Sequence, residues 1–166
     1  MPHRANCFLN TQFGINTIEQ KTMTPYTFDF RGTSMTVKIS SECAAGHYTV
    51  IEMNHPPLVG PALHIHPTHP ESFYVLEGEY TFYRGGEIIE AKAGDCVSIP
   101  PGTPHRYKVG NKCGRVIVLS PPTLERYFKA VSERIASGGI TLEEEKEIAS
   151  RHGQHFLDMS AHWEPK

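Results

Sequence analysis

The sequence predicts an all-β sandwich or barrel followed by two helices. Short segments rich in β-branched and aromatic residues alternate with Gly- and Pro-containing turns from about residue 35 to 120. Beyond Pro121 and Pro122, the apolar residues adopt a helical repeat. Strands followed by helices within 166 residues favour one domain with one core.

About nine short strands are expected. Residues 35–39 alternate apolar and polar side chains, which is typical of a half-buried strand. The other expected strands are residues 47–53, the segment around 64–66, and residues 73–76, 80–83, 88–89, 96–99, 107–109 and 115–119. Such closely spaced strands suit a sandwich or barrel.

Two helices are expected after the strands. The first carries apolar residues at i, i+4, i+7 and i+11, which are Leu124, Phe128, Val131 and Ile135. Gly138 should end it. Thr141 and Glu144 form a capping-box pair that opens the second helix, and Gly153 should end that one. The apolar stripe predicts that the helices pack on the barrel.

Three regions follow from these patterns. Residues 1–34 are weakly patterned and are expected to form an N-terminal arm. Residues 35–120 should form the barrel, and residues 121–166 a helical appendage packed on it. The tail includes Trp163, and the sequence leaves open whether the tail docks or stays loose.

Charge and composition restrict the class of protein. The net charge of -2 creates no general field for nucleic acid or an anionic membrane. No run of about 18 apolar residues occurs, and the first residues lack an apolar signal segment. A cytoplasmic location is therefore expected. The four cysteines form no CxxC pair, which argues against a zinc ribbon.

Residues 60–78 contain three of the four candidate functional side chains. His64 and His66 occupy alternate positions, so a strand would aim both imidazoles at one point. Glu71 follows a bend bounded by prolines and can re-enter the same cavity. His105 follows a proline-rich loop at residues 100–104, which restricts its backbone.

Three histidines and one carboxylate predict a mononuclear site for one divalent transition metal. His64, His66, Glu71 and His105 would leave two positions open on an octahedral ion. The donor set suits iron, manganese, nickel, copper or zinc. The alternative is a polar core without metal, in which each unsatisfied buried group costs about 1–3 kcal/mol.

Strand parity predicts the pocket beside this site. If Glu71 points inward, so do Phe73 and Val75; if His105 points inward, so does Tyr107. An apolar, aromatic cavity next to a metal favours a small hydrophobic or flat substrate. His69 lies in a Pro-rich bend and is expected outside the cluster.

The spacing of these residues resembles the cupin superfamily. Its first motif is matched by Gly60, His64, His66, Glu71 and Gly78. Three residues separate Gly60 from His64, whereas the motif usually has about five there. The second motif is matched by Gly94, Pro100, Gly102 and His105. Its final asparagine position is occupied by Val109. The surrounding sequence looks most like the quercetin-dioxygenase-like cupins.

The resemblance implies a double-stranded β-helix (jelly-roll) barrel with the metal inside, near one mouth. It also implies a homodimer, often formed by exchange of N-terminal strands. In cupins of this type Glu71 would serve as a base as well as a ligand, which requires a raised pKa.

Three functions are compatible with the sequence. The leading hypothesis is a metal-dependent dioxygenase that acts on a small, oxygen-bearing molecule of aromatic or hydrophobic character. The second is a redox-neutral cupin isomerase, lyase or cyclase. The third is a cupin that binds a small molecule without catalysis. The same donor set accepts several ions, so the sequence does not choose the metal.

Overall fold

The larger of two sheets forms one wall of the molecule. The computed structural model describes residues 24–160, 162 and 163. Along this six-stranded sheet the order is β1 (Tyr26–Phe30), β2 (Thr33–Ile39), β3 (Thr49–His55), β10 (Gly114–Ser120), β5 (Glu71–Glu77) and β8 (Cys96–Ile99).

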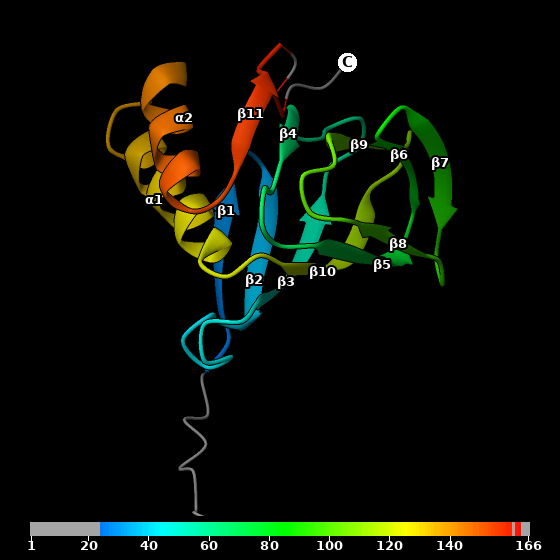
Figure 1. Ribbon diagram of the computed structural model, residues 1–166, viewed down its shortest axis with the longest axis horizontal. Coiled ribbons are helices and arrows are strands. Elements are labelled where there is room, and N and C mark those ends of the chain that lie inside the picture. The colour runs from blue at the N-terminus through cyan, green and yellow to red at the C-terminus, as the bar shows by residue number, and fades with distance from the viewer. Residues whose placement is uncertain (1–23, 161, 164–166) are drawn as a thin grey trace, which may run out of the picture.

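A five-stranded sheet forms the second wall. Its order is β11 (His155–Asp158), β4 (Leu63–Ile65), β9 (His105–Val109), β6 (Glu79–Arg84) and β7 (Glu87–Lys92). Neighbours pair antiparallel in both sheets, for example β10 with β5 and β6 with β9. The two sheets make a jelly-roll barrel with helices at one side (Figure 1), which confirms the predicted fold class.

The predicted N-terminal arm lies mostly outside the described residues. Its described end contains β1, which pairs over its whole length with β2 of the same chain, from Tyr26 opposite Val37 to Phe30 opposite Thr33. The expected boundary at residue 34 therefore falls inside β2. Strand exchange by residues 1–23 remains a prediction outside the described part of the chain.

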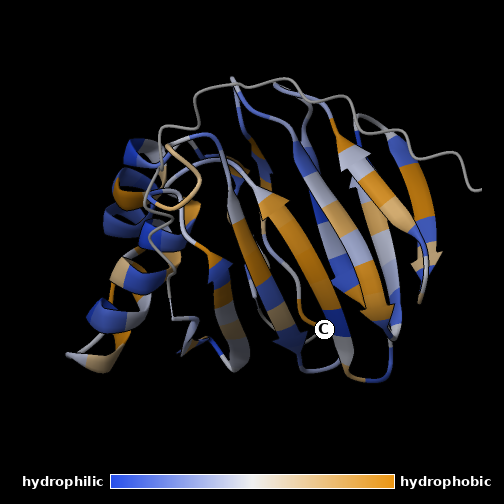
Figure 2. Ribbon diagram, turned by 90° about the horizontal axis from the view of Figure 1, so that it is seen from below, coloured by the Kyte–Doolittle hydropathy of each residue, from blue (hydrophilic) through white to orange (hydrophobic). Residues whose placement is uncertain are grey.

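Alternating side chains build the core. In β5 the burial alternates along the strand, so that Glu71, Phe73 and Val75 point inward. Orange and blue segments alternate along several strands in Figure 2, as strands with one buried face require. Residues with no exposed surface include Phe30, Met35, Val37, Ile51, Val75, Val116 and Val118.

Two of the motif glycines permit close approach of backbones. A Cβ on Gly60 would lie 1.9 Å from the carbonyl oxygen of Tyr107, so only glycine fits against β9. A Cβ on Gly78 would lie 2.7 Å from the carbonyl oxygen of Cys113, and its φ of +83° also favours glycine. These glycines hold the segments before β4 and after β5 against the barrel.

Both predicted helices are present. α1 (Leu124–Ala136) packs on β1, and the Phe128 ring lies 5.0 Å from that of Phe30, edge to face. α2 (Leu142–Arg151) opens with the predicted capping box between Thr141 and Glu144. Figure 1 shows the two helices side by side at the edge of the larger sheet. Neither helix is long and apolar enough to cross a membrane, in the part of the chain that the structure describes.

The tail docks on the barrel. β11 adds to the edge of β4, with His155 opposite Ile65 and Phe156 opposite His64. Trp163 is 5% exposed, and its backbone N–H donates to the carbonyl oxygen of Gly60 at 2.8 Å. The C-terminal region is therefore a strand-forming part of the sheet as well as a helical appendage.

Candidate metal centre

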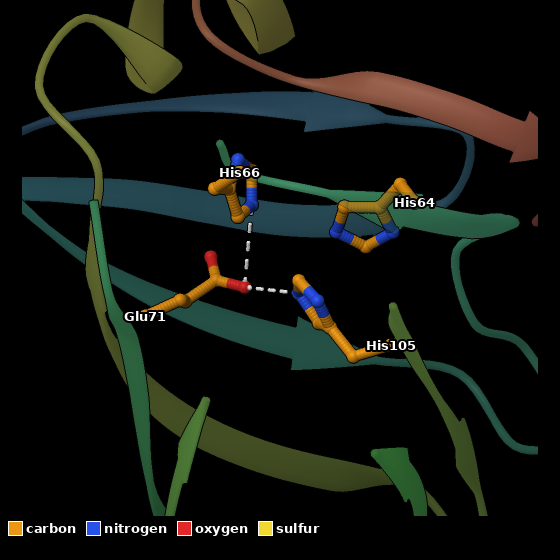
Figure 3. A group of neighbouring side chains, drawn as sticks. All are labelled: His64, His66, Glu71 and His105. Carbon is orange, nitrogen blue, oxygen red and sulfur yellow. Dashed lines mark hydrogen bonds and ion pairs between the residues drawn. The ribbon is translucent and has the colours of Figure 1, made fainter. Parts of the chain in front are cut away.

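Four side chains converge inside the barrel. His64, His66, Glu71 and His105 are buried, and one ligand atom from each lies within 4.8 Å of those from the others. In Figure 3 the four side chains surround a common space. The fold brings together all four residues that the spacing predicted.

Strand pairing explains the convergence. His64 in β4 lies directly opposite His105, the first residue of β9. His66 follows β4, and Glu71 is the first residue of β5. The proline-rich loop is tied to the same place because the N–H of Gly102 donates to the carbonyl oxygen of His66 at 2.8 Å.

Each histidine is held in the same tautomer. Because a carbonyl oxygen only accepts, each Nδ1 must carry a proton and donate it. His64 donates to Ala62 at 2.8 Å and His105 to Thr103 at 2.9 Å. His66 donates to Gly153 at 3.0 Å. All three Nε2 atoms are therefore free to face the interior, as in histidines that bind metals through Nε2.

The carboxylate of Glu71 is held between a serine and two histidines. Ser120, at the end of β10, donates to Oε1 at 3.2 Å. Oε2 lies 3.1 Å from Nε2 of His105 and 3.6 Å from Nε2 of His66. The longer distance leaves the buried Nε2 of His66 without a hydrogen-bond partner among the described residues.

The donor set fits a divalent metal ion. Neutral imidazoles with protonated Nδ1 present lone pairs at Nε2, and an ionised Glu71 adds negative charge. Lone pairs that face one another need a cation between them, either protons or a metal. Ligand atoms about 2.0–2.2 Å from one ion lie at most about 4.4 Å apart, so a small inward shift from the 4.8 Å span suffices.

The surroundings lower the pKa values of His64 and Glu71 and raise the pKa of His66. Burial, then the neighbouring His105 and His66, holds the pKa of His64 well below its ordinary value. Burial alone lowers the pKa of His66, but the Glu71 carboxylate outweighs burial and raises it. Burial alone raises the pKa of Glu71, but His66 and His105 outweigh it and lower it.

The pKa shift of Glu71 is opposite to the shift that a base role requires. A raised pKa was expected from the apolar site, and the adjacent imidazoles lower it instead. The lowered pKa favours the ionised carboxylate, which is the form that coordinates a metal. The base role stays a proposal that needs its own test.

Two curated proteins share part of this sequence. The chain is 32% identical over 71 residues to quercetin 2,3-dioxygenase of Bacillus subtilis, a match covering 42% of this chain and 21% of that protein. It is 39% identical over 61 residues to an uncharacterised protein of Methanocaldococcus jannaschii, covering 36% and 49%. The chain thus spans less than half the length of either relative.

A domain family and a solved structure agree with these matches. Residues 51–120 match the family described as Cupin domain. An RmlC-like cupin from Shewanella frigidimarina superposes with a TM-score of 0.52 at 21% identity, over 61% of this chain and 88% of the other. Residues 51–120 are a cupin domain. All four clustered side chains lie within it.

A small cavity adjoins the cluster inside the cupin domain. Its volume is about 20 Å³, room for about one water molecule. The lining residues come from the barrel, from α1 and from the tail, and are Met53, Pro61, His64, Glu71, Phe73, Tyr107, Leu124, Phe128, Gln154 and Trp163.

Two of the three predicted pocket residues line this cavity. Phe73 and Tyr107 line it, whereas Val75 is fully buried and is not among its lining residues. Parity assigns a side chain to a face but not to a depth along the strand. Val75 points inward as expected, but it lies two residues beyond Phe73 along β5 and so further from Glu71.

Several residues around the site were not expected from the sequence. Ser120 holds Glu71, the carbonyl of Gly153 holds His66, and Gln154 and Trp163 close the cavity. A single serine or a backbone carbonyl carries no spacing signal. The lone tryptophan was noticeable in the sequence, but nothing in the pattern linked it to the barrel.

The other histidines take separate places. His69 lies outside the cluster, where its Nδ1 contacts the hydroxyl of Thr68 at 2.8 Å. His152 contacts Thr123 and His155 is exposed. His162 is buried: its Nδ1 accepts from the N–H of Ala62, and its Nε2 lies 2.9 Å from Glu145.

Proposed function

We propose that the protein is a metal-dependent cupin enzyme that binds one divalent transition metal per chain. Nε2 of His64, His66 and His105 and the carboxylate of Glu71 would be the ligands. One observation carries this proposal: three imidazoles with fixed tautomers present Nε2 toward one carboxylate within 4.8 Å. A bound ion would satisfy the Nε2 of His66, which has no partner among the described residues.

We further propose dioxygenase activity on a small oxygen-bearing molecule. The similarity of residues in this cupin domain to quercetin 2,3-dioxygenase of Bacillus subtilis supports this choice. An ion in this site supplies Lewis acidity and, if redox-active, electron transfer to dioxygen. The choice among iron, manganese, nickel, copper and zinc is left to experiment.

The chain's own groups would bind and orient the substrate. Phe73 and Tyr107 line the cavity beside Glu71 and give that part of its wall an aromatic character. The phenol of Tyr107 contacts Nε2 of His55 at 2.9 Å, so the ring is fixed in place. Burial raises the pKa of Tyr107 well above its ordinary value, which keeps the phenol protonated. Glu71 is proposed to accept a proton from the substrate, in addition to its ligand role.

Oxygen consumption tests the proposed chemistry. The purified protein, loaded in turn with iron, manganese, nickel and copper, is supplied with flavonols, diketones and catechols in an oxygen-electrode cell. Metal-dependent uptake that is lost in His105→Ala supports a dioxygenase. Bound zinc with no oxygen uptake and turnover of a carbonyl compound would instead support the isomerase, lyase or cyclase hypothesis.

The Glu71→Gln variant separates the two proposed roles of this residue. The amide keeps the shape of the side chain but removes its charge and basicity. Metal content that survives with turnover abolished supports the base role. Loss of the metal together with turnover reduces Glu71 to a ligand.

The homodimer is a further proposal, supported by the resemblance of the sequence to small single-domain cupins. Light scattering coupled to size-exclusion chromatography measures the molar mass directly. A mass near twice the 18.6 kDa of the chain is expected. A mass equal to that of one chain at micromolar concentration would contradict it.

A further inference from the structure

Trp163 closes the cavity beside the candidate metal centre from outside the cupin domain. Its ring packs parallel to His55, with centroids 5.8 Å apart, and edge to face with Phe30 at 5.3 Å. The same cavity is lined by His64 and Glu71. A residue of the C-terminal tail therefore belongs to the wall that a bound ligand would contact.

The indole of Trp163 carries one hydrogen-bond donor, Nε1–H. Its Nε1–H is buried and has no acceptor among the described residues. A buried donor without a partner costs about 1–3 kcal/mol, and a buried tryptophan usually finds one. Packing alone does not account for this residue, because phenylalanine would supply an aromatic ring without the unmet N–H.

The backbone at Trp163 is also held in an uncommon conformation. Its φ of +56° lies in the left-handed region, which a bulky residue rarely adopts. The hydrogen bond from its N–H to Gly60 and the contacts of His162 with Ala62 and Glu145 keep the tail there. Trp163, which lines the cavity, is thus held in place at the expense of local strain, with an indole N–H that has no acceptor among the described residues.

We propose that Trp163 Nε1–H donates a hydrogen bond to an oxygen atom of the ligand that binds beside His64 and Glu71. The inference rests on the proposed metal-dependent function. The ligand class is a compound with a terminal carboxylate, enolate or carbonyl oxygen, because such an oxygen can accept from the indole. The cavity of about 20 Å³ admits only such a small terminus in this conformation.

The presence of one tryptophan in the chain makes a direct test possible. The ¹⁵N-labelled, zinc-loaded protein should give a single indole resonance in a ¹H–¹⁵N correlation spectrum. Sodium formate, the smallest carboxylate, is titrated against a sodium chloride control of equal ionic strength. A saturable downfield shift of the indole proton with formate alone is expected. An unmoved indole resonance in protein whose cobalt form binds formate would overturn the proposal.

Formate binding is measured independently in the cobalt(II)-loaded protein through its visible absorption bands. Trp163→Phe keeps an aromatic ring and should raise the formate dissociation constant about tenfold, the usual effect of losing a hydrogen bond to a charged group. The matched control is Tyr74→Phe, which removes one polar group from a ring that is 44% exposed, and should leave the constant unchanged.

The outcomes separate this inference from the proposed function. Cobalt bands that respond equally to formate in the wild type and in Trp163→Phe keep the metal site and remove the role of Trp163. Cobalt bands that form but do not respond to formate at 100 mM contradict the assigned ligand class. Absence of the bands removes the metal site itself, and the inference with it.

Discussion

The Nδ1–H of His66 donates to the carbonyl oxygen of Gly153 at 3.0 Å, across a separation of 87 residues. This bond joins a candidate metal ligand to the end of α2. A second connection runs through Ala62, whose N–H donates to His162 and whose carbonyl accepts from His64. The cupin domain therefore contains the four candidate ligands, and the C-terminal region contacts His66 directly and His64 through Ala62.

His66→Ala should abolish tight metal binding. Removing one of four ligands should lower affinity more than the 10–100-fold loss that follows removal of a supporting residue. Elemental analysis after dialysis measures the retained metal. His69→Ala is the matched control, because His69 lies three residues away and outside the cluster. Equal retention in both variants would contradict the assigned ligand.

Ser120→Ala should weaken metal binding without unfolding the protein. The Ser120 hydroxyl donates to Oε1 of Glu71, and its loss should lower the affinity about tenfold, as for other residues that support metal ligands. Competition with a fluorescent chelator measures the constant. Ser72→Ala is the control, since that hydroxyl contacts Ser98 on the exposed face of β5. An unchanged constant in Ser120→Ala would show that the bond does not support Glu71.

Glu145→Gln should destabilise the fold. Glu145 is fully buried in α2 and pairs with Arg31 at 2.6 Å, with further contacts to His162 and Tyr127. The variant weakens hydrogen bonds to a charged group in a pair whose arginine is 28% exposed, which should cost about 1–3 kcal/mol. Urea unfolding measures the loss. Glu143→Gln, an exposed change in the same helix, should cost less than about 1 kcal/mol. Similar losses in both variants would contradict the role assigned to the buried pair.

The stability of the protein should fall at acidic pH in part because of His55. Burial lowers the pKa of His55 in the fold to about 3, while the unfolded value is about 6.5. Below pH 6.5 the unfolded chain takes up a proton that the folded chain excludes, so the free energy of unfolding falls by up to about 1.4 kcal/mol per pH unit. This contribution is lost between pH 6.5 and 3.

His55→Gln removes this titration. Urea unfolding at pH 7.5 and 5.5 should show a smaller loss of stability in the variant than in the wild type, by about 1.4 kcal/mol. Other buried histidines, such as His64, titrate in both proteins and cancel in the difference. An equal loss in both proteins would contradict the low pKa of His55.

The clustering of the four candidate ligands could be predicted from the sequence because local patterns indicate where each side chain points. His64 and His66 share a strand face, and His105 follows a rigid proline loop that the fold places opposite His64. The start of α2 could also be predicted, because the Thr141 capping box is a local hydrogen-bond pattern. Such features depend on residues a few positions apart.

The features of the site that the sequence did not predict depend on contacts between distant segments. The carbonyl of Gly153 and the hydroxyl of Ser120 have no identifying sequence pattern, because many residues supply the same groups. The burial of His162 against Glu145 also requires the tail to fold back, which no local pattern predicts. The small size of the cavity likewise arises from the tail, whose docking the sequence left open.

Metal content measures the central claim most directly. The purified protein is loaded separately with iron, manganese, nickel, copper and zinc, dialysed, and analysed by elemental mass spectrometry beside His105→Ala. The account predicts about one equivalent of at least one ion per chain in the wild type, and its loss in the variant, since three histidines and Glu71 form one site. Less than about a tenth of an equivalent of every ion in the wild type, or equal retention in His105→Ala, would contradict it.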